Sequence, residues 1–277
     1  WPTALQYANA CGALAVSRHG CTPAYPSWTE LQFFLKRGIK RPDLRNDAEL
    51  EHVHWATNRA GNWSSVKTFA FDHRSQMEEM PGATPEKIAR FKHLCVDAAL
   101  RVQGGQPGFG ILCDERLGRD ALYRAAGTGL WIGRPTESPG TRPLMLEAQV
   151  GIDMGGLREW PRHHVVKCLC FCHPDDVSDM WAVQSQTVRS LFAAARRNGL
   201  EFLLEVIPSK CGPVDDMTTA TVIQRFYDLG VKPDWWKLEP FKTDSAWRNA
   251  VDAIERNDPY TRGIVVLGLD APETELA

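Results

Sequence analysis

Residues 234–241, Asp-Trp-Trp-Lys-Leu-Glu-Pro-Phe, form an apolar stretch that carries two opposite charges near its carboxyl end. Alternate side chains of a β-strand share a face, so the pattern predicts Trp235, Lys237 and Glu239 on the same face. A lysine in such a strand is costly to bury unless a carboxylate pairs with it or its pKa falls. A lysine with a lowered pKa is a nucleophile that can form a Schiff base. On this stretch alone, an ion pair that stabilises a sheet explains the charges equally well.

Strand-like and helical patterns alternate from about residue 64 onward. The predicted strands are Val66–Asp72, Phe109–Asp114, Gly129–Gly133, His164–Phe171, Glu201–Pro208, Asp234–Pro240 and Gly263–Leu269. The predicted helices are Pro85–Val102, Arg119–Ala126, Val177–Asn198, Met217–Leu229 and Asp244–Arg256. This alternation requires a parallel sheet with helices outside it. We therefore predict an α/β fold, a (β/α)₈ TIM barrel that lacks its last strand and helix. A doubly wound open sheet is the alternative, but no Gly-x-Gly-x-x-Gly motif follows the first strand.

The composition restricts the class of protein. The 277 residues can form one large domain or two small ones, and 43% hydrophobic and 24% charged residues are ordinary values for a globular protein. A formal net charge of −2 argues against a nucleic-acid partner. No apolar run approaches the roughly 20 residues that span a bilayer, and no signal peptide opens the chain. Eight cysteines in a chain of this length indicate free thiols. We expect a cytoplasmic protein that does not bind membranes.

The first 38 residues form a separate segment. Residues 8–35 read ANACGALAVSRHGCTPAYPSWTELQFFL and resemble the C-terminal tail of a PfkB-family (ribokinase-type) sugar kinase. The Gly-Ala-Gly-Asp motif of those kinases is absent, so we expect a capping pair of helices without kinase activity. A charged link over residues 39–63 follows, and the barrel occupies residues 64–277. Because the chain begins and ends within patterned sequence, we expect it to be a fragment of a longer protein.

Polar residues recur where the predicted strands end, which is where (β/α)₈ barrels carry their chemistry. They are Asp72, Arg74, Asp114, Arg134, Glu137, Lys167, Glu205, Lys237 and Glu239. Two ammonium groups in one pocket lower each other's pKa, so one can attack a carbonyl as a neutral amine while the other stays charged. Glu205, between the two lysines in the strand order, can transfer protons. The alternative is a Lys–Glu–Lys network with a purely structural role.

Four of these segments resemble motifs of class I tagatose-1,6-bisphosphate aldolases, which are Schiff-base (β/α)₈ barrels. The matching segments are Ala70-Phe-Asp-His-Arg74, Val166-Lys-Cys-Leu-Cys-Phe171, Leu204-Glu-Val206 and Trp236-Lys-Leu-Glu-Pro240. The resemblance implies that Lys237 forms the Schiff base and that Glu205 transfers protons. It also implies that Asp72 and Lys167 polarise the substrate.

A longer resemblance extends over nearly the whole chain. The segments WATN, FAFDHRSQ, LWIGRPTESPGTRPL, HVVKCLCFCHPDD, LEVIPSK, PDWWKLEP and GIVVLGLDAP occur in this order. They resemble the C-terminal aldolase-like domain (DUF2090 type) of bacterial fused inositol-catabolism proteins, in which a 5-dehydro-2-deoxygluconokinase precedes that domain. The resemblance implies a class I aldolase of myo-inositol catabolism, an aldehyde-lyase that needs no cofactor. Its substrate would be 6-phospho-5-dehydro-2-deoxygluconate, cleaved to dihydroxyacetone phosphate and malonate semialdehyde.

Partners and alternatives follow from the same comparison. The expected partners are the phosphorylated sugar acid and a fused or neighbouring sugar kinase domain. The alternative is a non-catalytic barrel that binds a sugar phosphate and regulates or scaffolds the kinase. The sequence leaves open whether the protein forms a homo-oligomer.

Further residues are candidates for substrate binding. Arg134 and Arg142 are either anion ligands or arginines that brace a loop. Gly268, with Asp270, can contribute part of a phosphate site after the seventh strand. Arg74, Asp114, Glu137 and Glu239 complete the set of predicted substrate-binding residues.

A metal site is the weaker interpretation of the remaining polar residues. Cys168, Cys170 and Cys172 alternate along one strand without the Cys-x-x-Cys spacing of zinc sites, so we expect inert thiols that face the helices. His173 and the two aspartates at 175 and 176 could be ligands, but either aspartate could equally cap the helix that follows. We predict no metal.

Overall fold

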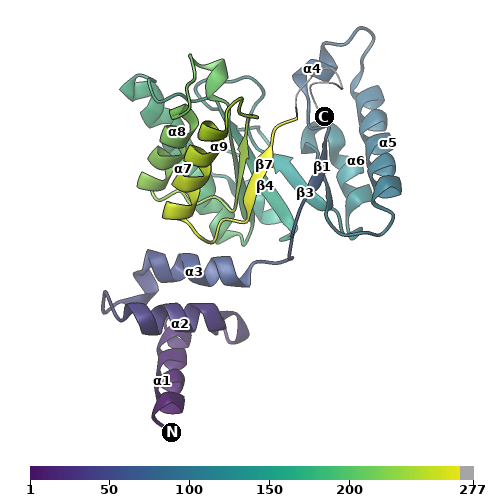
Figure 1. Cartoon of the computed structure of the whole chain (residues 1–277). Helices are drawn as coiled ribbons and strands as arrows, with labels where there is room; N and C mark the ends of the chain where they lie inside the picture. Colours follow the sequence, from purple (N-terminus) through teal and green to yellow (C-terminus); the bar gives the residue numbers. More distant parts are fainter. Residues whose placement is uncertain (269–277) are drawn as a thin grey trace. The chain divides into compact units, whose positions relative to one another are not determined.

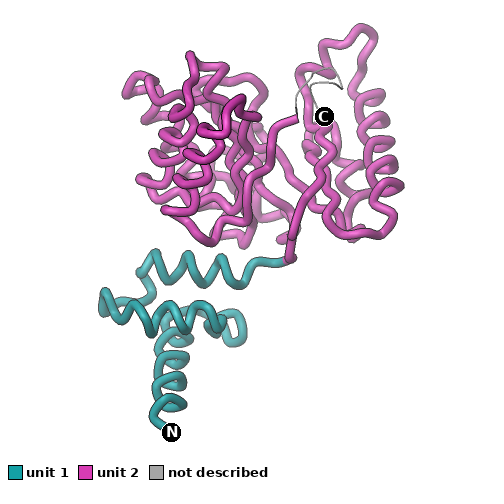
Figure 2. Tube along the Cα trace, viewed as in Figure 1, with its two compact units in different colours: residues 1–60 teal, residues 61–277 magenta. Residues whose placement is uncertain are grey.

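The computed structural model describes residues 1–268. The chain divides into two units, Trp1–Ala60 and Gly61–Ala277 (Figure 2). The division between the units falls within the segment 39–63 that we predicted as a linker, and each unit has its own apolar core.

The first unit is helical. Its elements are α1 (Pro2–Val16), η1 (Thr22–Ala24), α2 (Trp28–Arg37), η2 (Leu44–Asn46) and α3 (Ala48–Asn58). Helix α3 lies in the segment that we predicted as a linker. It forms because Asp47 caps it by accepting a hydrogen bond from the Leu50 amide at 3.2 Å, and because Leu50 packs against the buried side chains of α1 and α2. Asp47 also pairs with Arg37 of α2 at 2.5 Å.

The second unit contains a curled parallel sheet in which seven strands are hydrogen-bonded in chain order (Figure 1). The strands are β1 (Lys67–Ala70), β2 (Phe109–Leu112), β3 (Trp131–Pro135), β4 (His164–Cys170), β5 (Glu201–Val206), β6 (Trp235–Leu238) and β7 (Gly263–Val266). Every strand that the sequence predicted is present, although most are shorter than predicted. The described part of the sheet is a half-barrel with β1 and β7 at its ends. The α/β class and the parallel sheet are therefore confirmed.

Helices follow most of the strands. They are α4 (Ser75–Glu78), α5 (Pro85–Gln103), α6 (Glu115–Ala125), α7 (Ser178–Arg197), α8 (Thr218–Asp228) and α9 (Asp244–Asn257), with the short 3-10 turns η3 (Gly155–Glu159) and η4 (Pro208–Lys210). Helix α6 begins four residues earlier than predicted because the Asp114 carboxylate accepts the Leu117 amide at 2.8 Å and so caps it. Within residues 1–268, no helix has both the length and the apolar character needed to cross a membrane.

The two faces of the sheet bury different side chains, as the alternation along β6 predicted. Trp236 and Leu238 belong to the large outer core that packs under α7, α8 and α9, and α5 and α6 cover the β1–β3 end in the same way (Figure 1). The inner face carries a smaller apolar layer of Leu112, Trp131, Val165, Leu203 and Trp235. Inward positions of a strand are two residues apart. On each of β4, β5 and β6, the next inward position after this apolar layer holds a charged side chain. The charged side chains therefore lie next to this inner apolar layer.

Candidate functional site

Lys167, Glu205 and Lys237 meet on the inner face of three neighbouring strands. Glu205 on β5 is in register with Lys237 on β6, and its Oε1 lies 3.0 Å from Lys237 Nζ. Its Oε2 lies 2.9 Å from Nζ of Lys167 on β4. The three side chains are between 3% and 8% exposed. One carboxylate thus bridges the two lysines that the sequence predicted to share a pocket.

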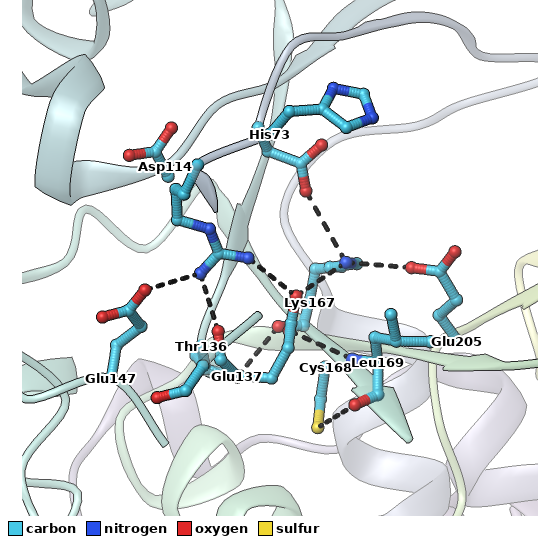
Figure 3. Close-up of polar contacts among 12 residues, drawn as sticks. His73, Asp114, Thr136, Glu137, Glu147, Lys167, Cys168, Leu169 and Glu205 are labelled. Atoms are coloured by element: carbon cyan, nitrogen blue, oxygen red, sulfur yellow. Dashed lines mark hydrogen bonds and ion pairs between the residues drawn. The ribbon is translucent and has the colours of Figure 1, made fainter. Parts of the chain in front are cut away.

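Two further carboxylates approach Lys167. Glu137 Oε1 lies 2.9 Å and Asp72 Oδ2 3.6 Å from Lys167 Nζ, and Figure 3 shows Glu137, Lys167 and Glu205 side by side. Burial acts to lower the pKa of Lys167, but the charges of Glu137, Glu205 and Asp72 raise it well above 10.5. Lys167 therefore stays charged at neutral pH.

Asp72 is ionised for the complementary reason. Burial acts to raise its pKa, but the positive charges of Lys167, Lys237 and Arg74 lower it below the ordinary value of 3.8. This interaction stabilises the fold at neutral pH, and its contribution is lost only as the pH falls below about 4 toward the lowered pKa. His73, which follows Asp72, points its ring away from Lys167 (Figure 3).

A hairpin after β3 delivers Glu137 to the site. The Thr136 amide and hydroxyl both donate to the Lys167 carbonyl at 2.9 Å, and Glu137 forms an antiparallel bridge with Leu146. The Leu169 amide donates to Glu137 Oε2 at 3.0 Å. The hairpin therefore fixes Glu137 against β4, where the other carboxylate oxygen meets Lys167.

The same hairpin holds Arg74. The Arg74 Nη1 donates to the Glu137 carbonyl at 2.6 Å and pairs with the Glu147 carboxylate at 3.0 Å, while Nη2 pairs with Glu137 Oε1 at 3.1 Å. Arg74 is only 4% exposed. Burial acts to lower its pKa, but Glu137, Asp72 and Glu147 raise it. Arg74 thus belongs to the site, and the sequence did not predict its partner Glu147, which lies ten residues after Glu137 in a loop.

The sequence analysis also missed Lys92, a fully buried residue of α5. Its Nζ pairs with Asp114 and donates to the backbone carbonyls of Phe71 at 2.9 Å and His73 at 2.8 Å. A signal was present: residues four before, three after and four after it are Ile88, Cys95 and Val96, so Lys92 lies on the apolar face of its helix. Its partner Asp114 was predicted as a substrate ligand, but it is occupied by Lys92 and by the cap of α6.

Arg134 does not join the lysine cluster, which consists of Lys167, Glu205 and Lys237. We predicted that β3 ends at Gly133, which would place Arg134 on a loop, but the strand continues to Pro135. Alternation then turns Arg134 to the outer face, where it stacks on Trp160 at 3.8 Å from the ring centroid and pairs with Glu115. It lines a cavity of about 370 Å³ together with His164.

Three other predicted substrate ligands lie outside the lysine cluster. Two of them make hydrogen bonds or ion pairs to other parts of the chain, and the third has open space around it. Arg142 donates to the Phe171 carbonyl at 3.2 Å and pairs with Asp176, so it braces a loop. Glu239 accepts hydrogen bonds from the Ser209 hydroxyl and from its amide at 3.2 Å. A Cβ added to Gly268 would meet nothing within 4 Å, and Asp270 lies outside the described residues.

The residues considered for a metal are arranged for other contacts. The part of the chain that is described, residues 1–268, holds no group of three or more His, Cys, Asp or Glu side chains placed to bind an ion. Cys168, Cys170 and Cys172 are buried in the outer core, facing the helices as predicted. Burial raises the pKa of the Cys168 thiol well above 9.0, so it is a protonated, unreactive group.

His173 and Asp176 have loop-stabilising roles. His173 Nε2 lies 2.9 Å from the Pro213 carbonyl, and its Nδ1 lies 3.2 Å from the Asp175 amide. Asp176 accepts the His173 amide at 3.0 Å. Neither aspartate caps α7, whose first turn receives no side-chain hydrogen bond from the preceding residue. The cap that we considered for Asp175 or Asp176 is therefore absent.

A comparison with protein families places the chain in one of them. A model of the family described as uncharacterized protein conserved in bacteria (DUF2090) matches residues 30–277. The chain belongs to the DUF2090 family. The DUF2090 match includes every residue of the lysine cluster and excludes all of α1 and the start of α2.

Two other comparisons add context. No curated protein matches the chain. Among solved structures, the crystal structure of Cgl0159 from Corynebacterium glutamicum is 14% identical, and the match covers 87% of this chain and 90% of that one with a TM-score of 0.44.

Proposed function

We propose that this protein is a class I aldolase-like lyase that cleaves a phosphorylated keto sugar acid through a Schiff base on Lys237. The observation that carries the proposal is the Glu205 carboxylate, whose two oxygens lie 3.0 Å from Lys237 Nζ and 2.9 Å from Lys167 Nζ. A Schiff-base aldolase needs an amine nucleophile, a proton-transfer group beside it and a fixed positive charge. Lys237, Glu205 and Lys167 are suited to these three roles in turn.

The proposed reaction begins when Lys237 loses a proton to Glu205 and its nitrogen attacks the substrate ketone. Glu205 returns the proton to the carbinolamine oxygen, which leaves as water and gives an iminium ion. The hydroxyl two carbons away from the iminium carbon then loses its proton to a carboxylate. The C–C bond between the carbon that carries this hydroxyl and the carbon next to the iminium breaks, and its electron pair moves into the iminium. An aldehyde departs, the remaining enamine takes up a proton, and water releases the ketone product and free Lys237.

The surrounding charges support the chemistry of these steps. The Lys167 ammonium can stabilise negative charge on a substrate oxygen, because preorganised charges act strongly in a site that excludes water. Asp72 is ionised and lies 3.6 Å from Lys167, so it is a second candidate base for the hydroxyl proton. Both groups are fixed before substrate arrives.

The same proposal extends to the complete fold, the partner and the substrate. We infer that the seven-stranded sheet belongs to a (β/α)₈ barrel, and that residues 1–38 derive from a kinase that is the partner of this domain. The substrate proposed from the sequence resemblance is 6-phospho-5-dehydro-2-deoxygluconate. Its 5-ketone and 3-hydroxyl have the spacing that retro-aldol cleavage requires, and the products would be dihydroxyacetone phosphate and malonate semialdehyde.

Reduction with borohydride in the presence of dihydroxyacetone phosphate tests the proposal, since it converts an imine into a stable secondary amine. Peptide mass mapping should find the adduct on Lys237 in the wild type and in Lys167→Met, and no adduct at this position in Lys237→Met. An adduct on Lys167 instead would retain the reaction class and reverse the two roles. Folded wild-type protein that binds the ligand without any adduct would favour the non-catalytic sugar-phosphate-binding alternative.

A further inference from the structure

We propose that Lys92 is a positioning residue that sets the place of Asp72 relative to Lys167 and Lys237. This inference rests on the proposed function for its kinetic consequence, but its structural part can be tested separately. Lys92 reaches the site from α5, with its Nζ 2.9 Å from the Phe71 carbonyl and 2.8 Å from the His73 carbonyl. These two carbonyls belong to the residues on either side of Asp72.

The backbone at Asp72 has little other support from the sheet. Strand β1 ends at Ala70, and the Phe71 amide makes one more bond of the ladder, to the Leu112 carbonyl at 3.0 Å. The Asp72 carboxylate lies 3.6 Å from Lys167 Nζ, whereas Glu137 and Glu205 lie at 2.9 Å. A contact of 3.6 Å is too long for a strong hydrogen bond, so the backbone contributes much of what fixes Asp72.

The environment of Lys92 is built to hold an ammonium group. An ammonium has three N–H donors, and Phe71, His73 and Asp114 supply three acceptors. Asp114 also balances the charge, which offsets the cost of burying a fully enclosed lysine. A Cβ added to Gly118 of α6 would lie 2.5 Å from Cys113 Sγ and 3.4 Å from Lys92 Cδ, so this glycine leaves room for the lysine chain.

The consequence is a link between α5 and the lysine cluster. Loss of the Lys92 ammonium would free both carbonyls and allow the turn that carries Asp72 and Arg74 to move. Misplacement of a catalytic group by about 1 Å can reduce a rate by up to about a hundredfold. Displacing Asp72 from the lysines would also return its lowered pKa toward the ordinary value.

The test uses the double variant Lys92→Met/Asp114→Asn, compared with Lys87→Met as a matched control on the same helix. The double variant leaves no unpaired buried charge, and asparagine can still cap α6. Lys87 is exposed and donates to the Gly82 carbonyl at 2.7 Å. The measurement is the rate at which 6-phospho-5-dehydro-2-deoxygluconate is cleaved to dihydroxyacetone phosphate as a function of pH, because Asp72 is a candidate base in the cleavage step.

We expect the rate to fall roughly tenfold to a hundredfold in the double variant and to stay at the wild-type value in Lys87→Met. The acidic limb of the pH profile should move to higher pH in the double variant, since Asp72 would need a higher pH to ionise. A purely structural role for Lys92 would lower the melting temperature without moving this limb. Wild-type rates and an unshifted limb in the folded double variant would overturn the inference.

A crystal structure of the double variant separates this inference from the proposed function. If the wild type forms no adduct, the proposed function fails, but the position of Asp72 can still be compared between the two proteins. An Asp72 carboxylate displaced from Lys167 Nζ would support the positioning role. A carboxylate that keeps its 3.6 Å distance would contradict it.

Discussion

Lys167 on the inner face of the sheet and His164 on its outer face are buried in opposite electrostatic surroundings. On the inner face, three carboxylates surround Lys167, and their charges raise its pKa in spite of burial. On the outer face, His164 is 3% exposed, and within residues 1–268 neither of its ring nitrogens has a hydrogen-bond partner. Burial, together with the charges of Arg134 and His163, lowers the pKa of His164 to about 3. A buried group thus keeps its charge only where opposite charges converge on it.

This difference bears on the proposed function. The outer-face histidine stays neutral and contributes to packing, whereas the inner face maintains several buried charges close together at a cost in desolvation. A set of apolar side chains could fill the same space without that cost. We infer that the inner charges are present for chemistry, and the following predictions test the contrast from the largest expected effect to the smallest.

The largest effect should come from Glu205→Gln. This change removes the carboxylate that contacts both lysines and leaves Lys237 buried without that counter-charge. Breaking a buried ion pair by removing one partner costs about 3–5 kcal/mol of unfolding free energy. Urea unfolding at pH 7 should show a loss of this size, because the other carboxylates contact Lys167 and not Lys237.

The control for that prediction is Glu205→Gln combined with Lys237→Met. Because the second change removes the uncompensated ammonium, it should restore part of the lost stability, and the two effects should not add. Two losses that simply sum would show that Glu205 and Lys237 are energetically independent.

A smaller, pH-dependent effect should come from His164→Phe, a change that conserves most of the ring volume. The unfolded chain binds a proton at His164 below about pH 6.5, while the folded protein binds it only near pH 3. Stability therefore falls with decreasing pH between these two values, by about 1.3 kcal/mol from pH 7.0 to pH 5.5. The variant should lose this component of the decline.

Urea unfolding at the two pH values measures the difference directly, with His93→Gln as the control because the His93 side chain is 42% exposed. The control should decline with pH as the wild type does. An equal decline in His164→Phe would mean that His164 is protonated or paired in the folded protein.

The smallest effect should come from an exposed ion pair. Arg116 and Glu78 lie 2.6 Å apart, with side chains 38% and 40% exposed. Solvent screening limits such pairs to about 0–1 kcal/mol, so Arg116→Ala should change the unfolding free energy by less than about 1 kcal/mol. A loss as large as that of Glu205→Gln would remove the distinction between buried and exposed charges on which the contrast depends.

Much of the fold could be predicted from the sequence because its signals are local. The alternation in 234–241 identified a strand and assigned Trp235 and Lys237 to the same face, and the structure confirms this through the inner layer and the Glu205 contact. The lysines and Glu205 come together because parallel neighbours in chain order align their carboxyl ends.

The missed features depend on information that is not local. Whether Arg134 belongs to a strand or to a loop depends on whether β3 ends at residue 133 or 135. Within a strand, neighbouring positions point to opposite faces of the sheet, so this boundary decides where the Arg134 side chain lies. Glu147 reaches Arg74 only through a hairpin in a loop that shows no periodic pattern. Lys92 was visible as a lysine on an apolar helix face, but its partners come from two other segments of the chain.

The most direct test of the account is a cleavage assay with 6-phospho-5-dehydro-2-deoxygluconate, with dihydroxyacetone phosphate as the measured product. We predict that the wild type releases dihydroxyacetone phosphate in the presence of a metal chelator, and that Lys237→Met, shown to be folded, does not. The control Lys87→Met should be as active as the wild type. Product release by Lys237→Met at the wild-type rate, or none from the folded wild type, would contradict the proposal that the inner lysine cluster is a Schiff-base aldolase site.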